Sequence, residues 1–396
     1  MTPMLRFGFG SSWPARAIAI GLALPGCGDD GPAAEGSGGT VETGGTDSLG
    51  TTTAPTGPST TGPTDPSNSG DPTTTASSIT TTASSDSEAD TTVGVADTSG
   101  DGEDTTGDPK IDPAASPGCG TSTVEPGAYP QVEVMAGGLM RQFDLQVPPN
   151  HDGSTPIPLV LAFHGWTLTS QIQAQMSDMS ATANDRGFAV AYPQGVGNSW
   201  NAGSCCGGAF DQQVDDVAFA LALVDSIGTE MCIDTNRVYS TGFSNGGFIS
   251  HRLGCVASDV FAAIGPVAGV IMIPDEQCNP ERAVPVMHLH GTADTSVAWE
   301  GNGMVPHISV PGSIQGWVDR NGCDADSTVT FQEGDTTCES WGNCGDDGAE
   351  VVLCTIEGMG HCWPGDPACT GLMETPSLTV QASEVVADFF EAHPMP

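Results

Sequence analysis

The feature that most limits how this 396-residue chain can fold is the absence of any aromatic residue between positions 28 and 118. This segment holds 21 Thr, 16 Asp plus Glu and a single basic residue, Lys110. Without large apolar side chains it cannot bury enough surface to offset the conformational entropy lost on folding. We therefore predict that 28–118 is a disordered acidic linker rich in Thr, Ser, Pro and Gly, which spans roughly 50 to 60 Å as a flexible coil. We predict that residues 119–396 form the folded domain.

Residues 1–27 have the pattern of an export signal. Arg6 and Arg16 supply positive charge, 17–24 is an apolar stretch of eight residues, and Cys27 follows a small residue. Eight apolar residues are too few to span a bilayer. The ending resembles the lipobox of bacterial lipoproteins, in which the Cys is acylated, and the alternative is ordinary signal cleavage. We expect an exported protein, either lipid-anchored through Cys27 at the cell surface or outer membrane, or secreted.

Residues 119–396 have the composition of a folded domain, with 12 Cys, six Trp, 33 Asp plus Glu, six Arg and no Lys. An even number of Cys in an exported chain indicates up to six disulfides, whose pairing the spacing does not determine. The whole chain carries a formal charge of −40, which disfavours nucleic acid and anionic lipid headgroups as partners. We expect a monomer that binds a neutral partner and touches a membrane through its lipid anchor alone.

Apolar runs bounded by turn residues alternate with helix-like stretches along this domain. Two early strands, 131–135 and 140–147, form a predicted hairpin. Further strands are predicted at 158–163, 188–192, 237–243, 284–290 and 351–356, and helices at 170–186, 213–229, 245–256, 313–320 and 380–390. The alternation predicts an α/β fold with a mostly parallel central sheet flanked by helices.

The segment Gly242-Phe243-Ser244-Asn245-Gly246 has the GxSxG pattern of a nucleophile elbow. It follows a predicted strand and opens a predicted helix, which is the context that the elbow requires. Glycines let the backbone turn sharply, and the start of the helix favours developing negative charge. An incidental Ser in a Gly-rich turn is the alternative, and the strand and helix on either side favour Ser244 as a nucleophile.

A base and an orienting acid follow Ser244 in the order that an α/β-hydrolase requires. Asp294 comes after the predicted strand 284–290, and His361 lies on a glycine-rich loop after the strand 351–356. We predict that His361 takes the Ser244 proton and later gives it to the leaving alcohol, and that Asp294 holds the imidazole in the required tautomer. Either residue alone has an ordinary explanation as a loop residue, but the order of all three indicates a triad.

The predicted oxyanion hole takes one donor from each of two segments. The first is the amide of Asn245, which directly follows the nucleophile. The second comes from the turn after strand 158–163, where we choose the Trp166 amide and keep Thr167 as the alternative. His164 in the same turn is expected to hold the turn by local hydrogen bonds rather than to take part in catalysis.

Seven segments together resemble the secreted polyhydroxybutyrate depolymerase and feruloyl esterase family, a carboxylesterase group of α/β-hydrolases. In the family's order they read FHGW, YPQGVGNSWNAGSCC, VDDVAF, VYSTGFSNGG, PVAG, HGTADTSV and GMGHCWPG, and they cover nearly all of 119–396. The resemblance implies the α/β-hydrolase fold, the same triad and the same oxyanion amides. Trp166 and Cys362 depart from the residues more usual in the family, which leaves the shape of the acyl pocket open.

Aromatic residues beside the motifs are the candidates for substrate binding. Trp200, Trp299 and Trp363, together with Trp166, are predicted to form a rim on which phenolic acids, sugars or a polyester can stack. Packing inside the domain is the alternative for each ring. Because the domain carries excess negative charge, anionic polymers are disfavoured as substrates.

We therefore predict an exported serine carboxylesterase that acts through an acyl-enzyme and needs no cofactor. Its substrate is a neutral ester, either a polyhydroxybutyrate-type polyester or a feruloylated or acetylated plant polysaccharide. Acyl transfer to an acceptor other than water would use the same intermediate. The alternative from another class is a non-catalytic polymer-binding module on a hydrolase scaffold.

Two further groups of residues lead to expectations about structure. Cys205 and Cys206 are expected to form separate bridges, since vicinal disulfides are strained, and Cys362 is expected to pair with Cys369. No metal site is predicted, because the acidic residues lack calcium or zinc spacing and fit solvated loops better. These acidic residues are Asp215, Asp216, Asp324, Asp326, Asp335, Asp346 and Asp347.

Overall fold

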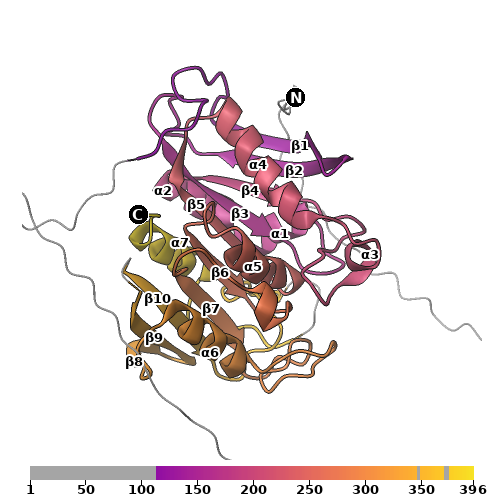
Figure 1. The fold of residues 1–396 in the computed structure, drawn as a ribbon, viewed down its shortest axis with the longest axis vertical. Helices are drawn as coiled ribbons and strands as arrows, with labels where there is room; N and C mark the ends of the chain where they lie inside the picture. The colour runs from indigo at the N-terminus through magenta and orange to yellow at the C-terminus, as the bar shows by residue number, and fades with distance from the viewer. Residues whose placement is uncertain (1–112, 346–347, 370–373) are drawn as a thin grey trace, which may run out of the picture. The chain divides into compact units, whose positions relative to one another are not determined.

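The structure, a computed structural model, describes residues 113–345, 348–369 and 374–396. The predicted signal, Cys27 and nearly all of the predicted linker lie outside the described residues. The described part contains a ten-stranded sheet in the order β1-β2-β4-β3-β5-β6-β7-β10-β9-β8 (Figure 1). Helices cover both faces of this sheet.

The strands divide into a parallel centre and two antiparallel edges. Their bounds are β1 Gly127–Ala136, β2 Leu139–Val147, β3 Ile157–Phe163, β4 Ala189–Pro193, β5 Ile233–Phe243, β6 Ala263–Val267, β7 Val286–Gly291, β8 Thr328–Glu333, β9 Thr336–Cys344 and β10 Ala349–Ile356. Strands β4, β3, β5, β6, β7 and β10 are parallel, while β1 with β2 and β8 with β9 pair antiparallel. This arrangement confirms the predicted α/β-hydrolase fold.

Three helices pack on each face of the sheet. Helices α4, α5 and α6 cover the face turned to the viewer in Figure 1, and α1, α2 and α7 cover the other. The bounds are α1 Ser170–Ser177, α2 Met179–Arg186, α3 Gly207–Asp211, α4 Asp216–Glu230, α5 Asn245–Val256, α6 Val310–Asn321 and α7 Ala382–Ala392, with a 3-10 turn at Asp275–Gln277. None of the helices in the described segments is both long and apolar enough to cross a membrane.

Strand β3 shows why the central strands read as continuous apolar runs. Leu159, Leu161 and Phe163 are buried in the core beneath α4 and α5. Val160 and Ala162, which alternate with them, are buried in the second core on the side of α2 and α7. A parallel strand covered on both faces has no solvent-facing positions, so its sequence shows no polar alternation.

The structure differs from the predicted elements in three places. The single helix expected at 170–186 is two helices, because Asp178 between them has a left-handed backbone with φ 49°. Strand β6 was not predicted, since it is five residues long and contains Gly and Pro. Strands β8 and β9 were also missed, and β8 has only two large apolar residues, Val329 and Phe331, with every position exposed.

Parallel strands bring their carboxyl ends to one edge of the sheet. The predicted site residues follow four of these ends: Trp166 comes after β3, Ser244 after β5, Asp294 after β7 and His361 after β10. Ligand and catalytic residues of open α/β sheets gather at this edge. The fold therefore places residues that are up to 195 positions apart in the sequence at the same end of the sheet.

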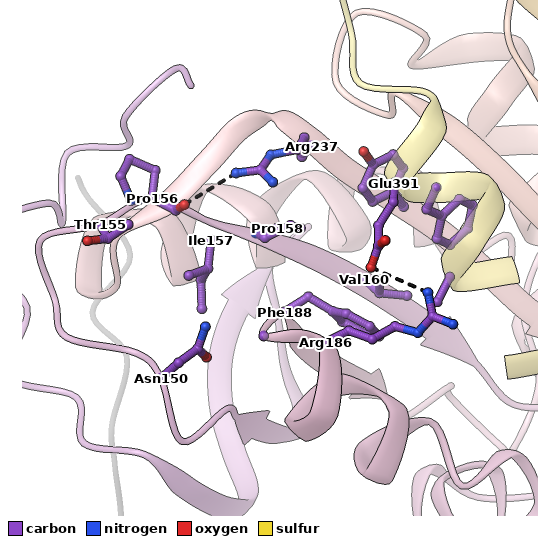
Figure 2. Close-up of a pocket in the computed structure, with 14 residues that line it drawn as sticks. Asn150, Thr155, Pro156, Ile157, Pro158, Val160, Arg186, Phe188, Arg237 and Glu391 are labelled. Atoms are coloured by element: carbon purple, nitrogen blue, oxygen red, sulfur yellow. Dashed lines mark hydrogen bonds and ion pairs between the residues drawn. The ribbon is translucent and has the colours of Figure 1, made fainter. Parts of the chain in front are cut away.

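A cavity of about 500 Å³ lies at the other end of the strands (Figure 2). Its wall includes Ile157 at the start of β3 and two arginines whose charges are paired. Arg186 lies 3.5 Å from the Glu391 carboxylate, and Arg237 lies 2.6 Å from that of Asp234. None of the described residues that line it is a Ser, Cys or His, so this cavity offers no side chain of the kinds predicted for the active site.

All 12 cysteines of 119–396 are paired. The six disulfides are Cys119–Cys232, Cys205–Cys206, Cys255–Cys278, Cys323–Cys344, Cys338–Cys354 and Cys362–Cys369. The expected Cys362–Cys369 bridge is confirmed. The expectation of separate bridges for Cys205 and Cys206 is wrong, because the other ten cysteines pair among themselves and leave these two for each other. So many disulfides require an oxidising compartment, which indicates export.

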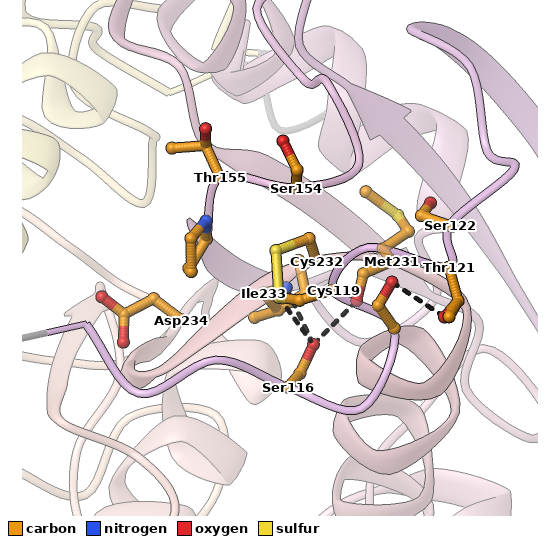
Figure 3. The surroundings of a disulfide bond; sticks show 12 residues. Ser116, Cys119, Thr121, Ser122, Ser154, Thr155, Met231, Cys232, Ile233 and Asp234 are labelled. Atoms are coloured by element: carbon orange, nitrogen blue, oxygen red, sulfur yellow. Dashed lines mark hydrogen bonds between the residues drawn. A yellow bond between two sulfur atoms is a disulfide. The ribbon is translucent and has the colours of Figure 1, made fainter.

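The Cys119–Cys232 disulfide fixes the beginning of the folded domain against the start of β5 (Figure 3). The Ser116 hydroxyl reinforces it, since it donates to the Met231 carbonyl at 2.8 Å and accepts from the Ile233 amide at 2.9 Å. The segment that enters the domain is thereby held by one covalent bond and buried hydrogen bonds.

We predict that replacing both Cys119 and Cys232 with Ala lowers the free energy of unfolding by about 4 to 5 kcal/mol, because the bridge constrains a long loop in the unfolded chain. The sequence separation of this pair is 113, against 21 for Cys323–Cys344. The matched double Ala variant of that shorter loop is expected to lose about 3 kcal/mol. Urea unfolding of both variants measures the difference, and a larger loss for the shorter loop would contradict the loop-entropy account.

Candidate active site

Ser244 occupies a sharp turn between β5 and α5. Its backbone has φ 55° and ψ −117°, a conformation that is rare for a residue with a side chain. The turn is held because the Ser244 amide donates to the Val267 carbonyl at 2.9 Å and the Ser244 carbonyl accepts from the Phe248 amide at 2.9 Å. Backbone strain of this kind persists where the surrounding structure fixes it, as at functional sites.

The two glycines of the motif are required by the closeness of neighbouring backbone. A Cβ on Gly242 would lie 2.6 Å from the Phe163 carbonyl oxygen, and a Cβ on Gly246 would lie 2.6 Å from the Phe163 carbonyl carbon. Because backbone atoms cannot move aside as a flexible side chain can, any larger residue would push β3 and α5 apart. The GxSxG spacing is thus imposed by the packing of the turn against β3.

His361 and Asp294 are joined by a hydrogen bond of 2.7 Å between Nδ1 and Oδ2. Both side chains are nearly inaccessible to solvent, with exposed fractions of 5% and 0%. The other oxygen of Asp294 accepts from the backbone amides of Ser296 and Val297, each at 2.8 Å. Burial by itself would raise the pKa of Asp294, but hydrogen bonds from His290 and His361 outweigh it and hold this pKa below its ordinary range.

Ser244 and His361 line one pocket of about 210 Å³. Most of the remaining wall is apolar and consists of Trp166, Phe248, Val297, Met304 and Val305, with Cys206, Thr167, Asn245 and Ser296. His361 is the single titratable side chain among these described lining residues. The pocket therefore suits an uncharged group.

The amides proposed for oxyanion binding lie at this pocket. Asn245 is the first residue of α5, so its amide has no partner within the helix. The Thr167 amide is engaged, since it donates to the Asn198 carbonyl at 2.8 Å. The Trp166 amide donates to no other described residue. Of the two alternatives left by the sequence, the structure therefore leaves Trp166 available.

His164 holds the turn after β3, as expected. Its Nδ1 lies 2.8 Å from the Gly165 carbonyl, and its Nε2 accepts from the Gly195 amide at 2.9 Å. The imidazole is therefore neutral, with its proton on Nδ1. Burial lowers the pKa of His164 to about 4.

Comparison with known proteins matches residues 142–324 to the family described as Esterase PHB depolymerase. These residues are similar to that family. The match includes Ser244 and Asp294 and ends before His361.

Individual relatives bear the names of esterases. Feruloyl esterase B from Piromyces equi is 30% identical over 236 residues, which are 56% of this chain and 42% of that protein. Putative esterase NocK from Nocardia uniformis subsp. tsuyamanensis is 29% identical over 256 residues, 59% of this chain and 73% of that protein. Poly(3-hydroxyalkanoate) depolymerase C from Paucimonas lemoignei is 27% identical over 238 residues, 53% of this chain and 56% of that protein. The chain thus spans less than half the length of feruloyl esterase B.

The Asn245 side chain connects the turn at Ser244 to the loop after β4. Its Oδ1 accepts from the Trp200 amide at 2.7 Å, and its Nδ2 donates to the Trp200 carbonyl at 3.1 Å. From the sequence, we predicted a role for Asn245 through its backbone amide alone. The side-chain contact was missed because the two residues are 45 positions apart.

An ion pair beneath the same loop was also missed. Asp216 was expected in a solvated acidic loop, and this expectation is wrong, because its side chain is 0% exposed and lies 2.8 Å from the Arg141 guanidinium. Its second oxygen accepts from the Asn201 amide at 2.8 Å, and Arg252 donates to the Asn201 carbonyl at 2.6 Å. Asp215 is the N-cap of α4. The ion pair therefore fixes the loop that carries Trp200.

The predicted aromatic rim is wrong for two of its members. Trp200 is 0% exposed and donates from its indole nitrogen to the His164 carbonyl at 2.8 Å, and Trp363 is 1% exposed in the core. Trp299 is half-buried against His290 and does not line the pocket. Trp166 is the exception, since it is 41% exposed and forms part of the pocket wall. Large indole rings bury too much apolar surface to be left at a loop surface where the core can accept them.

The described residues contain no group of three or more His, Cys, Asp or Glu side chains arranged to hold a metal ion.

We predict that the stability of the wild type relative to a His164→Asn variant falls as the pH decreases. The unfolded chain binds a proton at His164 below about pH 6.5, whereas the folded state, whose pKa is lowered to about 4, does not. The contribution of His164 to the free energy of unfolding is thus fully present above the pKa of the unfolded chain. Below that pKa it declines by up to about 1.4 kcal/mol per pH unit. Urea unfolding of both proteins between pH 7 and pH 4 measures the change. A difference that is constant with pH would contradict the buried neutral imidazole.

Proposed function

We propose that this chain is a serine carboxylesterase with Ser244 as nucleophile, His361 as base and Asp294 as orienting acid. The observation that carries the proposal is the buried 2.7 Å hydrogen bond between Asp294 and His361 in a site whose pocket is lined by Ser244 and His361. Because the His361 Nδ1 donates to Asp294, its Nε2 is left as the proton acceptor. The match of 142–324 to an esterase family supports the same chemistry.

In the proposed reaction the Ser244 oxygen attacks the ester carbonyl carbon while His361 takes the hydroxyl proton. The tetrahedral intermediate collapses as His361 gives this proton to the departing alcohol. Water then attacks the acyl-enzyme carbonyl carbon while His361 takes one of its protons, and His361 returns this proton to the Ser244 oxygen as the second tetrahedral intermediate collapses and the acid leaves. Asp294 stays ionised throughout, consistent with the lowering of its pKa.

The amides of Asn245 and Trp166 are the proposed donors to the negative oxygen that develops in each tetrahedral intermediate. Their support is the start of α5 at Asn245 and the engagement of the neighbouring Thr167 amide elsewhere. The two hydrogen bonds between the Asn245 side chain and the Trp200 backbone would keep the Asn245 amide in place before substrate binds. Donors fixed in advance need no reorganisation during the reaction, which is the source of their effect on rate.

We propose that the substrate is a neutral ester carried by a polymer. An uncharged acyl group suits the apolar pocket, and the exposed Trp166 ring offers a surface for stacking at its wall. The excess of 33 acidic residues over six Arg disfavours anionic polymers. The names of relatives support either a feruloyl ester or a hydroxyalkanoate polyester.

We predict that Ser244→Ala in the full chain lowers kcat on esters by at least about 10⁴-fold, because no nucleophile remains. Asp294→Asn is expected to lower kcat by about 10³ to 10⁴-fold, since His361 is then held in the wrong tautomer. Release of acid from methyl ferulate, acetylated xylan and a hydroxybutyrate oligomer provides the measurement and identifies the preferred substrate. The control is Ser154→Ala, an exposed serine in the loop before β3. Turnover that survives Ser244→Ala would refute the proposed nucleophile.

We also propose that a lipid on Cys27 holds the enzyme at the cell surface, with residues 28–118 as its tether. The support is the sequence Leu24-Pro25-Gly26-Cys27 after an apolar stretch, since the position lies outside the described residues. An acylated chain would present the domain away from the membrane at a distance set by the linker.

For the anchor, we predict that an alkyne-tagged fatty acid labels the wild type in a bacterial host and that the protein fractionates with membranes. Cys27→Ser is expected to lose the label and to be released, because the proposed attachment to lipid is through the Cys27 sulfur. A wild type that is unlabelled and soluble would show ordinary signal cleavage instead.

A further inference from the structure

Three histidines form a buried column beside Asp294, and neither the sequence analysis nor the proposed reaction uses them. His251, His288 and His290 are each 0% exposed. His288 Nε2 lies 3.0 Å from His290 Nδ1, and the two rings stack with an interplanar angle of 2°. The ring centroids of His251 and His288 are 5.5 Å apart. The column ends at Asp294, whose Oδ2 lies 3.3 Å from His290 Nε2.

The protonation of His251 follows from partners that have fixed roles. Trp317 Nε1 can only donate, and it lies 2.9 Å from His251 Nδ1, which must therefore accept. The Gly269 carbonyl can only accept, and it lies 3.2 Å from His251 Nε2, which must therefore carry the proton. His251 is thus neutral, and burial lowers its pKa to about 3. The deep end of the column contributes no charge.

The same reasoning fixes His290. The Val297 carbonyl lies 2.8 Å from His290 Nε2, so this nitrogen carries a proton. If His290 Nδ1 also carried one, it would donate to His288 Nε2 and leave a buried N–H on His288 Nδ1, which has no partner among the described residues. Buried N–H groups without an acceptor are rarer and costlier than acceptors without a donor. His288 therefore donates from Nε2, and His290 is a neutral imidazole with its proton on Nε2.

His290 Nε2 donates to the Val297 carbonyl at 2.8 Å, and the same nitrogen lies 3.3 Å from Asp294 Oδ2. Asp294 Oδ2 receives His361 Nδ1 at 2.7 Å and lies 3.3 Å from His290 Nε2, while Oδ1 receives two backbone amides. The carboxylate is thus surrounded by donors on both oxygens and cannot rotate without losing one. Removing His290 would free Oδ2 on one side and release the Val297 carbonyl.

We propose that His290 is a positioning residue for the reaction: as an Nε2–H tautomer imposed by His288, it fixes the Asp294 carboxylate that orients His361. This role rests on the proposed function, because it acts through the same Asp294 and His361. His290 itself does not line the pocket and touches no substrate.

The kinetic test uses two substitutions in the full chain. His290→Leu removes the donor and is expected to lower kcat on a soluble ester about 10- to 100-fold with little change in KM, since a small misplacement of a reacting group has such effects. His290→Gln keeps an N–H near the Nε2 position and is expected to recover most of the activity. If Gln is as damaging as Leu while both variants unfold at the same urea concentration as the wild type, the positioning role is wrong.

A double-mutant cycle separates positioning from a general structural effect. In an Asp294→Asn background, His290→Leu is expected to change kcat by less than about two-fold, because the group through which it acts is already absent. A purely structural residue would cost the same factor in both backgrounds, and that outcome would overturn the proposal.

Nuclear magnetic resonance tests the hydrogen bonds without relying on esterase activity. The low-field proton of His361 Nδ1 is expected to shift in His290→Leu and to stay nearly unchanged in His290→Gln. Long-range proton–nitrogen spectra of the wild type should show His290 protonated on Nε2 alone. If these signals behave as expected but no ester is hydrolysed, the proposed function fails and the hydrogen-bond arrangement stands. An unmoved His361 signal in His290→Leu, or a proton on His290 Nδ1, refutes the proposal itself.

Discussion

The turn at Ser244 depends on backbone that approaches closely at two positions without side chains. Gly242 and Gly246 allow β3 and α5 to meet at the Phe163 carbonyl, and this contact leaves Ser244 in a left-handed conformation at the end of β5. The loops that supply the remaining groups then pack around a point that is already fixed. Sheet geometry and local strain therefore act together, since neither alone would place a hydroxyl at this edge.

Positive charge in this acidic domain is used inside the structure. Arg141 pairs with buried Asp216, and Arg252 binds the Asn201 carbonyl of the loop they share. Arg282 donates to backbone carbonyls of Phe261 and Ala262. Arg186 and Arg320 pair with exposed carboxylates, and Arg237 pairs with the buried Asp234. The cations are thus committed to internal contacts, and unpaired carboxylates dominate the surface. This distribution supports a neutral partner for the proposed enzyme.

The buried polar groups near the site form two supports of different kinds. On one side, the hydrogen bonds between the Asn245 side chain and the Trp200 backbone and the Arg141–Asp216 ion pair hold the loop after β4. On the other, the histidine column holds Asp294 through neutral imidazoles, which avoid the cost of burying additional charge. The first support joins residues that are 45 and 75 positions apart, whereas the contacts of His290 with His288 and Asp294 are local. Their common effect is to fix hydrogen-bond donors and acceptors before any ligand enters.

The sequence by itself determined the fold class, the turn at Ser244 and the order of Ser244, Asp294 and His361, because apolar periodicity and glycine spacing are local properties of the chain. It could not determine which rings face the pocket, so Trp200 and Trp363 were placed at a rim although the core encloses them. It also could not find the partner of Asp216, the Cys205–Cys206 bridge or the contact of His290 with Asp294. The first is a contact across 75 positions of sequence, the second depends on how the other ten cysteines pair, and the third depends on the conformation of the turn after β7. Each of these is set by the tertiary structure and leaves no local pattern in the sequence.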